Sequence, residues 1–128
     1  MNKTPAADRR RIRSANRGVA LQLQLDACRR DGDISAMVIA DADGLPLATS
    51  GDDAACEEVA ARVVLVGRKI SNFAGTLLGA GATWDVHMTK VTVGNDELLV
   101  CAVGGRAEQR QRQVVRSATV AKRILQAA

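Results

Sequence analysis

A short hydrophobic segment followed by an aspartate-rich turn constrains the fold more than any other part of the sequence. The run 34–40 is unbroken and bounded by aspartates, which is typical of a strand covered on both faces. The turn 41–44 supplies aspartate side chains that can bond the backbone, and Gly44 can take a positive φ. Hydrophobic residues then alternate, and Pro46 has no amide donor, which favours a sheet edge. The segment predicts a hairpin of one buried strand and one edge strand.

An N-terminal helix is predicted over about 14–30, with a serine as its N-cap and a basic C-terminal end. Its hydrophobic residues alternate as they would in a strand, but its glutamines and alanines favour a helix. In a helix, Val19 and Leu23 form one stripe, and Leu21 and Leu25 form the opposite one. We therefore expect this helix to contact both a sheet and a second helix.

The longest helix is predicted over about 53–78. Acidic residues crowd its first turns, where they favour the positive end of the helix dipole. Its hydrophobic stripe consists of Val59, Val63, Val66, Ile70, Phe73 and Leu77. A second flank of small and hydrophobic residues makes the apolar sector wider than one sheet contact needs. We expect the extra width to face a partner, most simply a second copy; the alternative is a helix buried within the monomer.

The remaining elements are a hairpin over 84–103, turning at 94–97, and a last helix over about 106–126. The glycine pair Gly104–Gly105 before that helix could bind a phosphate but is expected to be a hinge, because no companion Lys-Ser/Thr accompanies it. This element order predicts an α+β fold. We expect an antiparallel sheet of four or five strands, with the long helix on one face and the N- and C-terminal helices on the other.

Residues suited to catalysis or metal binding are sparse. Cys28, Cys56 and Cys101 are far apart and have no C-x-x-C spacing, so a zinc site is not expected. His87, the only histidine, is expected to face water on its strand. We predict no cofactor, no metal and no enzyme activity. Because no hydrophobic run is long enough for secretion or membrane spanning, a cytoplasmic location is expected.

Basic residues are concentrated at both ends of the chain. Residues 1–30 hold eight Lys or Arg against two acids, residues 31–105 hold four against eleven, and residues 106–128 hold six against one. Residues 1–13 are interpreted as a flexible basic arm and 14–128 as one domain. An alternative function follows, in which the arm and the last helix bind DNA, acidic lipid or an acidic protein. Its candidate residues are Arg9, Arg10, Arg11, Arg13, Arg110, Arg112 and Arg116.

The hairpin sequence D-x-D-G-L-P-L-A, followed by Ser-Gly and a helix, resembles the opening of Roadblock domains. This family includes dynein light chains and bacterial regulators of Ras-like GTPases. The resemblance in element order extends from Ser14 to about Val103, although Roadblock domains usually carry a third strand after the long helix and only two are predicted here. It implies a profilin-like sheet and a homodimer in which the long helices pair and the sheets run edge to edge.

The resemblance also implies a partner, a small Ras-like GTPase bound on the paired surface. Such proteins act as platforms, sometimes hastening hydrolysis by shaping the GTPase's own site. The helix stripe carries over as the dimer contact, and the partner-facing candidates are Arg62, Arg68, Lys69 and Asn72. A remoter interpretation is a small-ligand or haem sensor, but one histidine and no tyrosine argue against haem.

Overall fold

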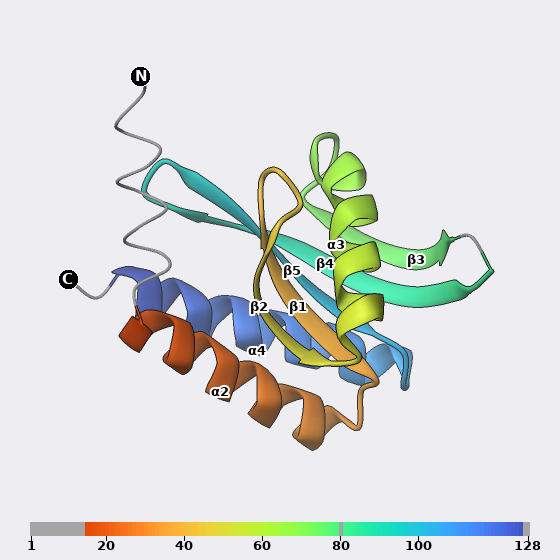
Figure 1. Ribbon diagram of the computed structural model, residues 1–128, viewed down its shortest axis with the longest axis horizontal. Coiled ribbons are helices and arrows are strands. Elements are labelled where there is room, and N and C mark those ends of the chain that lie inside the picture. The colour runs from red at the N-terminus through yellow and green to blue at the C-terminus, as the bar shows by residue number, and fades with distance from the viewer. Residues whose placement is uncertain (1–14, 80, 127–128) are drawn as a thin grey trace.

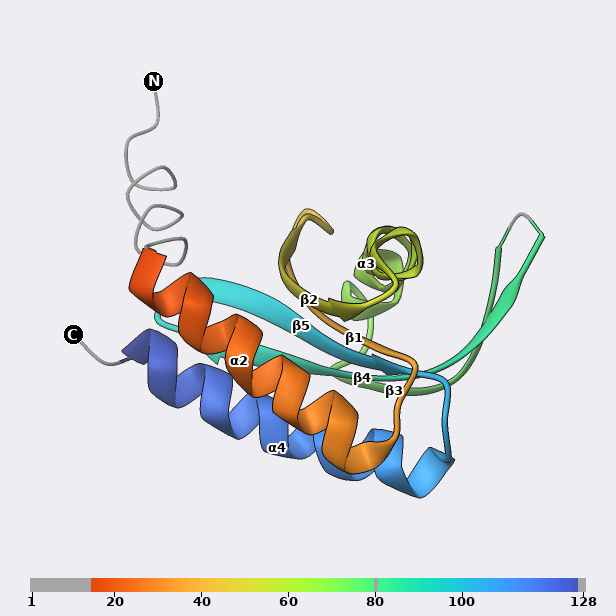
Figure 2. The same ribbon diagram turned by 60° about the horizontal axis from the view of Figure 1, so that its bottom comes forward.

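The computed structural model describes residues 15–79 and 81–126, which form three helices and one sheet. The elements are α2 (Ala15–Gly32), β1 (Ala36–Asp41), β2 (Pro46–Gly51), α3 (Asp53–Gly67), β3 (Asn72–Leu78), β4 (Thr83–Val93), β5 (Asp96–Val103) and α4 (Ala107–Gln126). All five strands pair antiparallel in the order β2-β1-β5-β4-β3. Helix α3 covers one face of the sheet, and α2 and α4 lie side by side on the other (Figures 1 and 2).

The predicted α+β fold and both predicted hairpins are confirmed. In the first hairpin, Asp41 Oδ1 accepts hydrogen bonds from the backbone N–H groups of Asp43 (2.9 Å) and Leu45 (3.0 Å). Gly44 has a φ of 84°, the left-handed conformation that the turn requires. Strand β1 is buried, and β2, which begins at Pro46, lies at one edge of the sheet as expected.

The prediction of one helix over 53–78 is wrong in its second half. Helix α3 ends at Gly67, and 72–78 is β3, the third strand that the Roadblock resemblance called for. The error has a physical cause, because the residues at 66, 70, 73 and 77 satisfy helical spacing while Phe73, Gly75 and Leu77 satisfy strand alternation equally well. A Cβ on Gly67 would lie 2.8 Å from Cδ2 of Leu99, so α3 ends close against its own sheet.

The N-terminal helix is confirmed as α2, but only one of its two hydrophobic stripes is buried. Leu21 and Leu25 are fully buried against the sheet. Val19 and Leu23, which form the opposite stripe, are 58% and 62% exposed. Helix α2 contacts α4 through their shared hydrophobic cluster and through polar groups, including a 2.9 Å hydrogen bond from Gln24 Nε2 to Ser117 Oγ. The proposed N-cap serine lies outside the described residues.

Each face of the sheet has its own hydrophobic cluster, one under α2 and α4 and the other under α3. A polar cluster joins α2 to β2: Ser50 Oγ donates to Asp26 Oδ1 (2.6 Å), and Arg29 Nε donates to Ser50 Oγ (2.6 Å). These bonds satisfy the buried Ser50 hydroxyl and fix the helix against the edge strand. Among the described residues, no helix combines the length and hydrophobicity needed to cross a membrane.

Candidate partner-binding surface

The hydrophobic residues predicted to form a dimer contact separate into a buried group and a partly exposed group. Val59 and Val63 lie on the inner side of α3, where they are fully buried against the sheet of their own subunit. The other predicted residues are less covered: Val66, Phe73 and Leu77 are partly buried at the margin of the same cluster, and Ile70 is exposed. With Trp84, these four form a surface between α3 and β3, which we call the α3–β3 rim (Val66, Ile70, Phe73, Leu77, Trp84).

Strand β3 is an edge strand whose outer backbone groups can be identified from the register. Lys90 donates its backbone N–H to the carbonyl of Ser71 at 2.8 Å, so this pair is hydrogen-bonded. Hydrogen-bonded pairs alternate along an antiparallel ladder, so the backbone groups of Phe73, Gly75 and Leu77 also bond to β4. The backbone N–H and C=O groups of the residues between them therefore point away from β4, toward the open edge of the sheet. These outward residues are Asn72, Ala74, Thr76 and Leu78.

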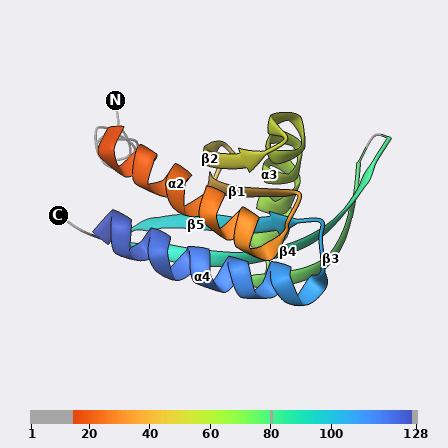
Figure 3. The same cartoon turned by 90° about the horizontal axis from the view of Figure 1, so that it is seen from below.

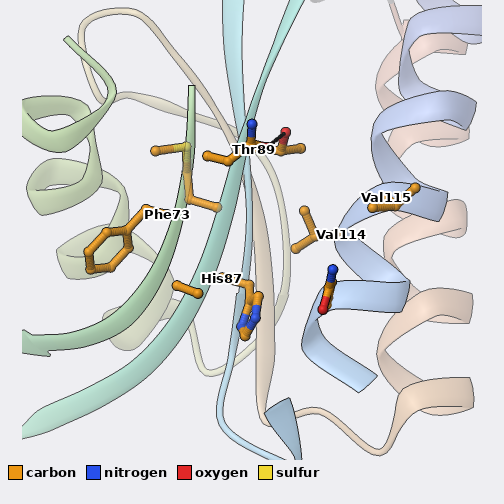
Figure 4. A pocket seen from close by; sticks show the side chains of 9 residues that line it. Phe73, His87, Thr89, Val114 and Val115 are labelled. Carbon is orange, nitrogen blue, oxygen red and sulfur yellow. Dashed lines mark hydrogen bonds between the residues drawn. The ribbon is translucent and has the colours of Figure 1, made fainter. Parts of the chain in front are cut away.

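The side chains of Asn72 and Ala74 on β3 line a groove between β3, β4 and α4. This groove has a volume of about 360 Å³, and its lining includes Ala74, His87, Val114 and Val115 (Figure 4). Phe73 points to the opposite, α3 side of the strand (Figure 4). Beside the groove, Thr89 Oγ1 donates a 2.7 Å hydrogen bond to Asn72 Oδ1, which links the edge strand β3 to β4.

His87, which was expected to face water, is half-buried and held by Arg110 from α4. The Nε–H of Arg110 donates to His87 Nδ1 at 3.1 Å, and its Nη1 donates to the carbonyls of Gly104 (3.0 Å) and Gly105 (2.8 Å). Partial burial lowers the pKa of His87, and the nearby Arg110 charge lowers it further. A histidine whose Nδ1 accepts a hydrogen bond carries its proton on Nε2 when neutral, so this residue acts as a structural acceptor between sheet and helix.

The four predicted GTPase-facing residues lie on different sides of the sheet. Arg62 pairs with Glu58 at 3.0 Å along α3, and Arg68 and Lys69 are exposed just beyond the end of that helix. Asn72 lies at the groove, on the α4 side. The structure therefore places Arg68 and Lys69 next to each other after α3, leaves Arg62 within the helix in an ion pair with Glu58, and separates Asn72 from all three.

The predicted anionic-surface residues are also divided. Arg110 is buried and bonded to His87, so its charge is not available to an external ligand. Arg116 is exposed but pairs with Asp31 of α2 at 2.7 Å, whereas Arg112 is exposed and has no ion pair within the described part of the chain. The four arginines of the N-terminal arm lie outside the described residues.

The three cysteines are buried and free. Burial raises the pKa of each thiol, most strongly that of Cys101, which disfavours a reactive thiolate. Over residues 15–79 and 81–126, no group of His, Cys, Asp or Glu has the arrangement of a metal site.

Two exposed hydrophobic residues near the rim were not identified from the sequence. Leu65 is 59% exposed on the outer side of α3, and Leu78 is 73% exposed at the end of β3. Both lie within the single helix that the sequence predicts over 53–78, so their separate exposure on α3 and β3 was not expected. The glycine at 67 and the alternation from Phe73 to Leu77 were the signals that could have separated helix from strand.

No family model matches this chain, and no curated protein matches it in sequence. Solved structures do resemble it. The structure of Myxococcus xanthus MglB has a TM-score of 0.62 at 11% identity, covering 89% of this chain and 93% of that one. A structure described as MglB with tetrameric arrangement has a TM-score of 0.59 at 15% identity, covering 86% and 88%.

A third structure, the gliding protein MglB from Thermus thermophilus, has a TM-score of 0.59 at 16% identity and covers 86% of this chain and 91% of that one. All three similarities extend over nearly the full length of this chain and of the MglB chains, so they concern the whole fold. At these identities they bear on architecture alone. The chain has the Roadblock-type fold of the MglB proteins.

Proposed function

We propose that this protein is a dimeric, non-catalytic regulator that binds a small Ras-like GTPase. The observation that carries the proposal is a Roadblock-type fold whose β3 edge is open and flanked by partly exposed hydrophobic residues. An open edge strand beside apolar surface is the arrangement that strand addition by another chain uses.

The dimer forms through the β3 edge and the α3–β3 rim. Two copies of β3 pair antiparallel, and each contributes the outward backbone groups of Asn72, Ala74, Thr76 and Leu78. The greatest number of these groups is satisfied when Gly75 faces its own counterpart, because all four outward residues are then paired. In that register the exposed Leu78 of one copy lies opposite Asn72 of the other, beside the groove.

The GTPase binds the exposed side of α3 in this dimer. Leu65 provides an apolar contact there, and Arg68 and Lys69 provide positive charge. Exposed hydrophobic side chains bordered by cations suit a specific protein partner, with the charges increasing the rate and selectivity of association. As the Roadblock resemblance implies, the protein acts by shaping the active site of its partner.

The dimer is tested with the variant Val66→Glu/Ile70→Glu, which introduces charge at the rim. Light scattering and sedimentation should report a dimer for the unaltered protein and a monomer for the variant, with unchanged circular dichroism. The matched control is Val19→Glu/Leu23→Glu on the opposite face of the sheet, which should remain dimeric. A dimer that persists in the rim variant would contradict this interface.

The partner is tested by mixing the dimer with purified small Ras-like GTPases of the same cell, loaded with GDP or with a non-hydrolysable GTP analogue. We expect binding that depends on the nucleotide and is weakened at least about tenfold by Arg68→Glu/Lys69→Glu, because two exposed charges are reversed. That variant should stay dimeric, which separates the two halves of the proposal. An intact dimer that binds none of these GTPases in either state would overturn the GTPase assignment alone.

A further inference from the structure

The outer surface of the α2–α4 layer combines exposed hydrophobic residues with a cluster of arginines. Val19 and Leu23 are one helical turn apart on α2, and both are more than half exposed. Helices α2 and α4 run next to each other on one side of the sheet (Figure 3), and both carry exposed arginines. We call this the helix-layer surface (Val19, Leu23, Arg30, Arg112, Arg116, Arg123).

Little negative charge opposes these arginines. Arg30, Arg112 and Arg123 form no ion pair with any described residue, and Arg116 is neutralised by Asp31. Glu108, the one acidic residue of α4, pairs with Arg106 at the start of that helix. Asp26 of α2 is turned to the β2 side, where Ser50 donates to it. Among residues 15–79 and 81–126, the surface therefore carries three positive charges without an ion pair around two aliphatic side chains.

The rest of the fold gives these two aliphatic residues no internal role. The sheet-facing stripe of α2 is complete without them, because Leu21, Leu25 and Cys28 are buried. Those residues share one hydrophobic cluster with α4, and the contact between the helices is completed by Gln24 with Ser117 and by the ion pair of Asp31 with Arg116. Val19 and Leu23 are thus a hydrophobic stripe that neither packing interface of α2 uses.

We propose that the helix-layer surface docks on an anionic lipid bilayer. The interface of such a bilayer attracts clustered Arg and Lys electrostatically and accommodates short aliphatic side chains among its headgroups. Duplex DNA would attract the arginines equally but offers less to the exposed Val19 and Leu23. The combination of charge with central aliphatic residues therefore favours lipid over nucleic acid.

This docking is compatible with the partner surface described above. Helix α3, the α3–β3 rim and the β3 edge lie on the other face or at the far edge of the sheet (Figures 1 and 2). A bilayer beneath α2 and α4 leaves them accessible. The inference does not depend on the proposed GTPase, since it uses only the charge and exposure of α2 and α4.

The test is sedimentation of the full-length protein with vesicles of phosphatidylcholine alone or of phosphatidylcholine mixed with phosphatidylglycerol, at low and high salt. We expect retention only on the anionic vesicles, reduced by salt. Each uncompensated arginine near an anionic surface contributes about fivefold in partitioning, so Arg112→Gln/Arg123→Gln should weaken retention by about 25-fold. Leu23→Gln should weaken it without changing the net charge.

The matched control is Arg68→Gln/Lys69→Gln, which removes the same charge from the α3 side and should leave vesicle retention unchanged. All of these side chains are exposed, so thermal unfolding should be the same for every variant. Four results would overturn the proposal: no retention on anionic vesicles, equal loss in the control, retention of duplex DNA but not vesicles, or loss only on replacing Arg9, Arg10, Arg11 and Arg13 with glutamine.

Discussion

At the scale of single residues, Arg110 connects α4 to the sheet through several hydrogen bonds. Its side chain extends from α4, and its guanidinium donates hydrogen bonds to Nδ1 of His87 on β4 and to the carbonyls of Gly104 and Gly105. Those glycines have φ values of 78° and 64°, so the loop is a tight turn that Arg110 closes from within. The glycine pair was expected to be a hinge, but in the structure hydrogen bonds from Arg110 hold its two carbonyl groups.

Replacing Arg110 with methionine should lower the free energy of unfolding by about 1–3 kcal/mol, because one buried nitrogen and two carbonyls lose their partner while the aliphatic packing is kept. Urea denaturation followed by circular dichroism measures this. The control is Arg112→Met, two residues along the same helix on its exposed side. Equal stabilities for the two variants would show that the hydrogen bonds of Arg110 contribute nothing.

His87 predicts a pH dependence of stability. Its pKa is lowered in the folded protein, first by partial burial and then by the Arg110 charge, so the unfolded chain binds a proton more readily than the folded one. Stability should therefore fall as the pH drops below about 6.5, the ordinary histidine value. In His87→Gln this part of the decline should be absent, which urea titrations between about pH 7.5 and 5 can measure. Identical slopes for both proteins would exclude the effect.

At the scale of elements, β3 gives the most direct test of edge pairing. The N–H of Thr76 points outward, whereas that of Gly75 bonds to β4. Thr76→Pro should therefore leave the monomer folded and abolish the dimer, since an edge strand tolerates proline on its free side. Gly75→Pro should destabilise the monomer itself by about 1–3 kcal/mol, because a hydrogen bond of the β3–β4 ladder is lost. Sedimentation and thermal unfolding distinguish these outcomes, and a dimeric Thr76→Pro protein would argue against β3 pairing.

At the scale of the whole molecule, association should couple to stability. If two copies bind through β3, the thermal unfolding midpoint of the unaltered protein should rise with protein concentration, because the dimer is favoured by mass action over unfolded chains. The Thr76→Pro protein should show no such rise. Scanning calorimetry over a hundredfold concentration range provides the measurement, and a midpoint independent of concentration in the unaltered protein would contradict dimerisation.

The sequence alone determined the elements whose residue pattern fits only one kind of secondary structure. The turn at 41–44 specified the first hairpin through Asp41 and Gly44, and the continuous hydrophobic run of β5 specified a central strand. These features depend on neighbours within a few residues, so local rules were sufficient.

Only the tertiary structure decided where α3 ends and which stripe of α2 is buried. Residues 72–78 fit both a helix and a strand, and the choice came from the free edge of β4, whose backbone groups at Val86 and Met88 needed partners. The stripe of Leu21 and Leu25 faces the sheet because polar bonds from Gln24 and Asp26 set the rotation of α2. Contacts between segments distant in the sequence decided both features. The spacing of hydrophobic residues along the chain carries no information about such contacts.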